Sequence, residues 1–445
     1  MSKRKRKSNK RTKPMERKPQ TNSQPDAGKD LTQGDHPKTL NAIAEQLKSS
    51  DKKVQLIYAF NGTGKTRLSR EFKELVAPKN PDDGGDEKSE LSRYKLLYYN
   101  AFTEDLFYWD NDIMANADPK LKIQPNTFTD WILRDRGQDR NIIDNLQRYT
   151  DDKLTPIFIE RNKSIPQDGK RVTTKTYPEV VFSFDRGTER SGNIKISKGE
   201  ERNFVWSVFY TLLQEVTSIL EEPDQTKRDD DQFDELEYVF IDDPVSSLDD
   251  THLIELAVDL ANLIKRSHFH KGKGLRFIIT THSPLFYNVL HNELNNDLKN
   301  PIQGGAPASL YKRGQSEKYR LEKHDDGTFE LSASNDHPFS YHLFLLSEVR
   351  KAIRDKQVSK YHFAFLRNIL EKTATFLGYP RWEDLLEKTN EGLPNPFASR
   401  LMNLSSHSAH AGEEIADIEQ KDKEKLDDLV SYLIETYGFN KQEAQ

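Results

Sequence analysis

Three short apolar runs stand out in the first two thirds of the chain, at residues 54–57, 238–241 and 277–281. Their composition is typical of strands that are buried in a parallel sheet. Apolar residues at helical spacing begin near residue 201 and predict an amphipathic helix between the first and second strands. From about residue 336 the pattern becomes helical and rich in aromatic residues. The pattern therefore predicts an α/β domain followed by an all-α domain.

The first predicted strand leads into a glycine-rich segment with the composition of a phosphate-binding loop. Gly62 and Gly64 allow backbone N–H groups to turn inward around phosphate oxygens, because glycine adopts positive φ without a Cβ clash. We expect Lys65 to reach the β- and γ-phosphates and Thr66 to bind Mg²⁺. The strict motif has glycine where this chain has Ala59. The expected nucleotide-binding residues of this loop are Asn61, Gly62, Thr63, Gly64, Lys65, Thr66 and Arg67.

The other two predicted strands end in residues suited to nucleotide hydrolysis. Asp242 and Asp243 follow the second strand, and His282 follows the third. We expect Asp242 to act on the Mg²⁺ side, Asp243 to be the base that polarises water, and His282 to reach a γ-phosphate. Ligands collect at the carboxyl ends of parallel strands, so these side chains should lie at the same sheet edge as the glycine-rich loop.

The start of the predicted helix supplies a second anion site. Ser197 and Glu200 have the spacing of a capping box, and a helix amino end attracts anions. With the loop, the aspartate pair, residues 246–249 and His282, this segment resembles the signature motif of an ABC-type ATPase head. The resemblance implies head-to-head pairing, in which one protomer completes the nucleotide site of the other. Its expected contacts with the nucleotide come from Ser197, Lys198, Gly199 and Glu200.

Two departures from the ABC pattern predict a slow switch rather than a fast motor. Lys198 stands where glycine is usual, and Asp243 stands where glutamate is usual. An aspartate side chain is shorter by one C–C bond, about 1.5 Å, so it should hold the attacking water less well. About 130 residues separate Thr66 from Ser197, with no long heptad repeat between them. This spacing argues against the coiled-coil arms of chromosome-maintenance ATPases.

Composition limits the cellular setting. The 445-residue chain has no cysteine, which excludes disulfides and thiolate metal sites. No apolar run approaches the roughly 20 residues needed to cross a bilayer, so we expect a soluble cytoplasmic protein. Residues 1–20 contain ten Lys/Arg and one Glu. We expect this segment to be a solvated disordered arm, with loose phosphate binding as the functional alternative. The expected division is a basic arm at 1–36, an NTPase head at 37–330 and a helical domain at 331–445.

The helical domain carries candidate residues for RNA cleavage. Residues 341–380 contain seven Lys/Arg and three acidic residues in a chain of net charge −5. Arg367 and Glu371 are i,i+4 neighbours on one helix face, and His407 ends a later helical run. Their structural alternatives are a surface salt bridge and a capping or core histidine. An arginine, a carboxylate and an imidazole nevertheless suffice for metal-independent RNA cleavage, with one base, one acid and one cation at the phosphate.

With these residues, the sequence resembles the PrrC family of bacterial anticodon nucleases. The family's nuclease domain is of the HEPN type and has an Arg-x-x-x-Glu pair followed by a histidine, which fall here on Arg367, Glu371 and His407. The departures at Lys198 and Asp243 are shared with the family. The expected fold is thus an α/β ABC-type P-loop NTPase head followed by an all-α HEPN-like nuclease domain. The resemblance also rests on residues 54–72, 98–110 and 196–201.

The resemblance implies a function and its partners. It implies an antiviral ribotoxin that cuts tRNA-Lys 5′ of the wobble base, leaving a 2′,3′-cyclic phosphate and a 5′-hydroxyl. It implies a latent state held by a type I restriction-modification complex, and a homo-oligomer of even order built on head-to-head dimers. The implied cofactors are Mg²⁺ with ATP or GTP, and a thymidine nucleotide as a regulator.

Two hypotheses of other classes remain open at the level of sequence. The first is an NTPase sensor or scaffold of a phage-defence complex whose nuclease is a separate protein, which predicts that Arg367, Glu371 and His407 are dispensable. The second is a DNA-end-processing ATPase, which predicts hydrolysis stimulated by DNA.

Overall fold

The computed structural model describes most of the chain. The described residues are 38–78, 95–100, 105–110, 119–167, 170–185, 190–244, 250–270, 272–300, 308–324, 326–334, 340–388, 395, 397, 400 and 418–439. The chain divides into two units, Met1–His36 and Pro37–Gln445, and every described residue belongs to the second. The basic arm expected at residues 1–36 therefore lies outside the described residues.

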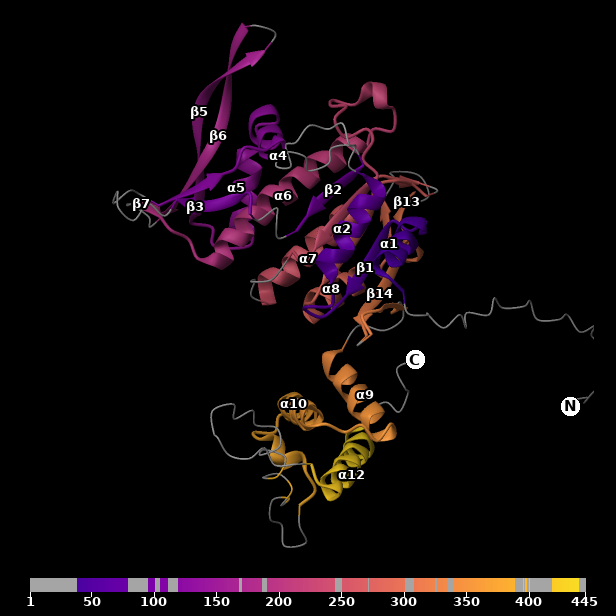
Figure 1. Cartoon of the computed structure of the whole chain (residues 1–445). Coiled ribbons are helices and arrows are strands. Elements are labelled where there is room, and N and C mark those ends of the chain that lie inside the picture. The colour runs from indigo at the N-terminus through magenta and orange to yellow at the C-terminus, as the bar shows by residue number, and fades with distance from the viewer. Residues whose placement is uncertain are drawn as a thin grey trace, which may run out of the picture. The chain divides into compact units, whose positions relative to one another are not determined.

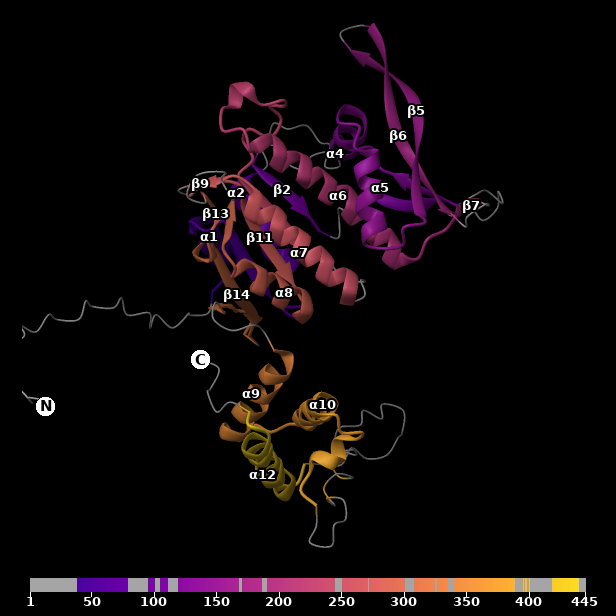
Figure 2. The same cartoon turned by 180° about the vertical axis from the view of Figure 1, so that it is seen from behind.

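A six-stranded sheet forms the centre of the head (Figures 1 and 2). Its order is β15-β14-β1-β11-β8-β2, and every neighbouring pair is parallel except β14 with β15. The three apolar runs are confirmed as strands, and they are the adjacent central strands β1, β11 and β8. The strands are β1 (Val54–Tyr58), β2 (Leu96–Tyr99), β8 (Tyr238–Asp242), β11 (Arg276–Thr281), β14 (Ser316–Lys323) and β15 (Phe329–Ala333).

Both faces of this sheet are buried, because alternate side chains of each strand enter different cores. On β1, Ile57 packs into the core that also holds residues of α1 and α2, whereas Leu56 packs into the core of α6, α7 and α8. The helices are α1 (Leu40–Ser49), α2 (Lys65–Val76), α6 (Lys198–Leu220), α7 (Asp250–Arg266) and α8 (Pro284–Leu294).

Helix α6 differs from the amphipathic helix expected from sequence, because it is buried around most of its circumference. Its Trp206 packs edge-on against Tyr99 of the central sheet, with ring centroids 5.2 Å apart. Phe204 packs edge-on against Phe182 of a second sheet, at 5.2 Å. The helix thus joins two sheets and retains little exposed surface for a polar face.

The second sheet has five antiparallel strands and was not predicted from the sequence. Its order is β3-β4-β6-β5, with β7 paired to β6. A short helical region lies between β4 and β5 in the chain. These elements are β3 (Phe107–Asp110), β4 (Lys120–Ile123), α4 (Thr127–Asp130), the π-helical turn η1 (Trp131–Asp135), α5 (Asp139–Arg148), β5 (Leu154–Gln167), β6 (Lys170–Asp185) and β7 (Arg190–Ile194).

Shorter elements complete the head. The segment 221–235 contains one 3₁₀ turn. β9 pairs with β10 and β12 with β13. The elements are η2 (Gln225–Lys227), β9 (Phe269–His270), β10 (Lys273–Gly274), β12 (Leu298–Asn300), β13 (Ala308–Tyr311) and η3 (Arg313–Gln315).

The described elements after Ser340 are all helical and enclose a core of their own. β15 crosses the boundary expected at residue 330, and the first helix begins at Tyr341. Gly378 and Gly438 end two helices in the left-handed conformation, with φ of 78° and 71°. The helices are α9 (Tyr341–Arg354), α10 (Lys360–Leu377), η4 (Trp382–Leu385) and α12 (Gln420–Tyr437). Within the described residues, no helix has the length and apolarity needed to span a membrane.

Candidate functional site

The loop between β1 and α2 has the backbone of a phosphate-binding loop. Gly62 and Gly64 have φ of 81° and 110°, conformations that a residue with a Cβ rarely adopts. Gly64 caps α2, so Lys65 and Thr66 occupy the first turn of that helix. The helix amino end and the loop N–H groups together form an anion site. The loop therefore has the backbone conformation that the sequence predicts for it.

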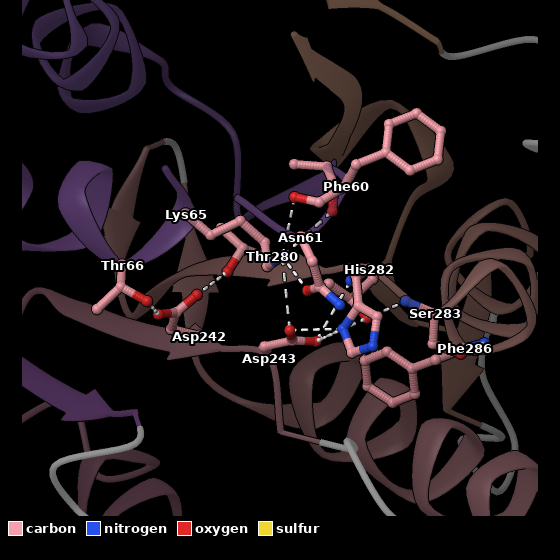
Figure 3. A network of polar contacts seen from close by, with 12 residues as sticks. Phe60, Asn61, Lys65, Thr66, Asp242, Asp243, Thr280, His282, Ser283 and Phe286 are labelled. Atoms are coloured by element: carbon pink, nitrogen blue, oxygen red, sulfur yellow. Dashed lines mark hydrogen bonds and ion pairs between the residues drawn. The ribbon is translucent and has the colours of Figure 1, made fainter. Parts of the chain in front are cut away.

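Lys65 lies at the centre of the polar network in Figure 3. Its Nζ donates to the carbonyl oxygens of Ala59 and Phe60 and to Oδ1 of Asn61, each at 3.3 Å. It also lies 3.6 Å from Oδ2 of Asp243. These partners hold a buried ammonium group in place. A γ-phosphate entering the loop would compete for the same cation.

Asp242 and Thr66 form the candidate Mg²⁺ site. Thr66 Oγ1 donates to Asp242 Oδ2 at 2.7 Å, and Thr280 Oγ1 donates to Asp242 Oδ1 at 2.5 Å. Burial raises the pKa of Asp242, and the two hydroxyl bonds oppose that shift only in part. The donor set fits Mg²⁺, which is bound through oxygen and in nucleotide sites through one or two protein groups. A cation here would offset the cost of burying the carboxylate.

Asp243 and His282 form a close pair at the same sheet edge. His282 Nδ1 lies 2.7 Å from Oδ1 and 2.6 Å from Oδ2 of Asp243, and the His282 backbone N–H donates to Oδ1 at 3.3 Å. Burial raises the pKa of Asp243, but the His282 hydrogen bond and the charges of Lys65 and His282 outweigh it and lower the pKa overall. Asp243 also has φ of 55°, a left-handed conformation that is costly outside glycine.

The sequence placed these groups correctly at one edge but did not reveal their pairing. The sequence assigns separate roles to Lys65, Asp242, Asp243 and His282. It does not indicate the contact between Asp243 and His282 or the hydrogen bond from Thr280. The only signal was parallel pairing, since the register of β11 with β8 places Thr280 beside Asp242. That register depends on contacts 38 residues apart in the chain. Residues 246–249, which belong to the expected ABC-type motif set, lie outside the described residues.

The signature segment has the expected capping box. Ser197 Oγ accepts from the Glu200 N–H at 3.2 Å, and the Ser197 N–H donates to Glu200 Oε2 at 2.7 Å. Lys198 pairs with Glu201 at 2.8 Å, and Glu201 also accepts from Trp109 Nε1 at 2.7 Å. These bonds fix the first turn of α6, which includes Gly199. Arg67, expected to bind the nucleotide, has its guanidinium 5.9 Å from the ring centre of Phe329.

The candidate nuclease residues lie on α10. Arg367 Nε donates to Glu371 Oε1 at 2.8 Å, and the two side chains are 30% and 45% exposed. The pair is therefore open to solvent, as a substrate-binding pair or a surface salt bridge would be. His407 lies outside the described residues. The sequence did not point to His342 of α9, whose side chain forms a hydrogen bond with Asn368, the neighbour of Arg367. Burial lowers the pKa of His342, and the hydrogen bond with Asn368 opposes that shift.

Comparisons with known proteins agree with this arrangement. A family model described as an AAA domain matches residues 180–433. An anticodon nuclease from Escherichia coli is 48% identical over 434 residues, covering 92% of this chain and 99% of that protein. A solved Smc head domain of Pyrococcus furiosus is 12% identical over 50% of this chain and 40% of its own, with a TM-score of 0.23. A SmcHead bound to the C-winged helix domain of ScpA is 11% identical over 64% of this chain and 90% of its own, with a TM-score of 0.30. These two TM-scores are too low to support an argument.

The phosphate-binding loop, the parallel sheet and the matched AAA model define the class of the protein as a P-loop ATPase. Within that class, the chain belongs to the anticodon nuclease family. The family resemblance seen in the sequence is thereby confirmed.

Proposed function

We propose that this protein is a tRNA anticodon nuclease whose activity is controlled by an ABC-type NTPase head. The observation that carries the proposal is the 48% identity to an anticodon nuclease across 92% of the chain, a span that includes both the head and α10. The solvent-open Arg367–Glu371 pair on α10 of the helical domain supports it. The substrate we propose is tRNA-Lys, cut 5′ of the wobble base.

The nuclease reaction follows from three side chains. Glu371 or His407 removes the proton of the ribose 2′-OH, and the 2′-oxygen forms a bond to the adjacent phosphorus. The bond from phosphorus to the 5′-oxygen breaks, and the other of the two groups protonates that oxygen. The products are a 2′,3′-cyclic phosphate and a 5′-OH. Arg367 neutralises the charge on the phosphoryl oxygens, and no metal takes part.

The head binds the nucleotide with residues of two protomers in this proposal. Lys65 and the loop N–H groups hold the phosphates of ATP or GTP, and Thr66 and Asp242 hold Mg²⁺, which neutralises charge on the phosphates. Asp243 positions the attacking water with His282 beside it. Ser197 of the second protomer completes the site, so the oligomer is of even order. A thymidine nucleotide acts as a regulator.

Contacts between the phosphate-binding loop and α9 provide a route from the nucleotide to the nuclease domain. The Phe60 ring lies 6.1 Å from the Tyr341 ring and 5.1 Å from the Phe344 ring, centre to centre. Tyr341 and Phe344 pack against both the core of the head and the core of the helical domain. The Phe60 carbonyl also accepts from Lys65, so a nucleotide that draws Lys65 away changes the support of Phe60. We propose that this contact transmits the nucleotide state. In the cytoplasm, a type I restriction-modification complex keeps the nuclease latent as part of antiviral defence.

The nuclease assignment is tested by expressing single variants in cells and mapping RNA ends. Arg367→Ala, Glu371→Ala and His407→Ala should each abolish anticodon-loop cleavage, by about 10²-fold or more for the acid or base. Nucleotide hydrolysis should continue in all three, because the head is unchanged. His410→Ala, three positions beyond His407, is the matched control and should cleave as wild type. Cleavage that survives in all three alanine variants would show that the nuclease is a separate protein.

A further inference from the structure

The outer part of the β5–β6 hairpin is a two-stranded ribbon. β5 and β6 pair from Leu154 with Phe184 to Gln167 with Lys170. Within the described strands, β4 pairs with β6 only at residues 179 and 180, and β7 only at residues 182–185. Among the described residues, no third strand pairs with the stretch 161–176, and both views show the ribbon extending beyond its sheet (Figures 1 and 2). A two-stranded hairpin in water is marginally stable by itself. The length of this ribbon therefore indicates a role other than stabilising the fold.

This ribbon is strongly basic. Residues 161–176 contain five Lys/Arg and a single Asp, a net charge of +4 in a chain of −5. The Arg161 and Lys175 side chains are each 60% exposed, and Lys163 is exposed. The other residues of 161–164 and 173–176 are Asn, Ser and Thr. These described parts of the ribbon contain no apolar side chain that could join a core.

The cations are distributed over both faces of the ribbon and exceed the nearby acids. Arg161 is opposite Thr176 and Lys163 is opposite Thr174, which places both cations on one face, about 6.7 Å apart along the strand. Lys175 is on the other face, where it pairs with Glu160 at 3.0 Å. Arg161 reaches Glu179 only at 3.7 Å, and that carboxylate is already shared with two lysines of β4. The ribbon therefore keeps an uncompensated positive field.

We propose that the basic ribbon, residues 161–176, is an arm that binds the sugar–phosphate backbone of the RNA substrate. Cations on a solvated surface bind phosphates, and Ser and Thr hydroxyls add hydrogen bonds to phosphate and sugar oxygens. A protein partner would require an apolar or aromatic patch at its centre. The ribbon has no aromatic residue, and its five cations outnumber its three apolar residues, Ile165, Pro166 and Val172. RNA is favoured over DNA because the inference rests on the proposed nuclease function. Backbone binding predicts affinity without sequence preference.

The test uses the full-length protein and an anticodon stem-loop with a 2′-deoxy sugar at the cleavage position, which cannot be cut. The variant is the triple substitution Arg161→Gln, Lys163→Gln and Lys175→Gln. Each lost phosphate contact reduces the slope of log K against log salt by about 0.7, so three contacts reduce it by about 2. Affinity at 0.15 M salt should fall by roughly tenfold or more. Nucleotide hydrolysis should be unchanged.

A matched control removes three exposed lysines elsewhere on the head, by Lys95→Gln, Lys227→Gln and Lys273→Gln. The control should retain the wild-type slope; an equal loss in both triple variants would show a general effect of charge and overturn the inference. An unchanged slope in the ribbon variant, with normal RNA binding by wild type, would also overturn it. If the ribbon variant lost affinity for duplex DNA but not for RNA, the arm would be a DNA contact. A wild-type protein that neither binds nor cuts tRNA would instead contradict the proposed nuclease function.

Discussion

At the scale of single residues, the unusual feature is the conformation of Asp243. Its φ of 55° is costly for a residue with a Cβ, and such strain persists where the surrounding structure enforces it. The carboxylate is contacted by both Lys65 and His282, as Figure 3 shows. The carboxylate is thus held ionised beside the nucleotide site. This is the arrangement that a residue positioning water would need.

Asp243→Asn separates charge from conformation. Asparagine adopts the left-handed region more readily than most residues, so the fold should be preserved. Removal of the base should slow nucleotide hydrolysis by about 10²- to 10⁴-fold while nucleotide binding remains. Steady-state hydrolysis and nucleotide affinity of the purified variant measure the two effects. Hydrolysis at the wild-type rate would exclude Asp243 as the base.

At the scale of elements, the central strands and the helical character of the last domain were predictable, and the second sheet was not. The runs at 54–57, 238–241 and 277–281 are mostly apolar because both faces of their sheet are covered. β5 and β6 instead carry polar and charged residues over much of their length, and only their inner ends, at Leu154, Val180 and Phe182, enter the core. The dipeptide Asp168-Gly169, between paired Gln167 and Lys170, was the available hairpin signal.

In the helical domain, the first turn of α12 contains a buried carboxylate, Asp422, that pairs with Arg400. Arg400 donates to both carboxylate oxygens of Asp422, at 3.1 and 2.7 Å, and the Asp422 side chain is 2% exposed. The Arg400 hydrogen bond lowers the pKa of Asp422. Because the folded pKa lies below the unfolded value, the stabilisation is present above that value and is lost as pH falls through the folded pKa.

Arg400→Ala should therefore reduce the free energy of unfolding of the helical domain by about 1–3 kcal/mol at pH 7, since a buried acceptor loses its donor. The difference from wild type should shrink as the pH falls from about 4, the pKa of an unfolded aspartate, through the lower folded pKa of Asp422. Denaturant unfolding at several pH values measures it. Lys425→Ala, which breaks an exposed pair with Asp428 on the same helix, should change stability little at any pH. A difference that persists unchanged in acid would assign the effect to packing rather than charge.

At the scale of the whole molecule, α9 connects the nucleotide site of the head with the helical domain. Phe60 belongs to the phosphate-binding loop and contacts the first turn of α9. Other residues of α9 pack against α10 and α12. α10 carries Arg367 and Glu371. A change in the support of Phe60 thus has a continuous packed route to α10, which carries the proposed nuclease residues. The sequence could not show this route, because it requires contacts between residues almost 300 positions apart.

The measurement that tests this account most directly is RNA cleavage with and without nucleotide, with hydrolysis recorded on the same samples. Wild-type cleavage should depend on the nucleotide. Phe344→Ala should hydrolyse nucleotide normally, but its cleavage should no longer respond to the nucleotide, because the ring that contacts Phe60 is absent. Leu343→Ala, which removes a half-exposed neighbour on the same helix, should behave as wild type. A Phe344→Ala protein that retains the full nucleotide response would contradict control of the nuclease through α9.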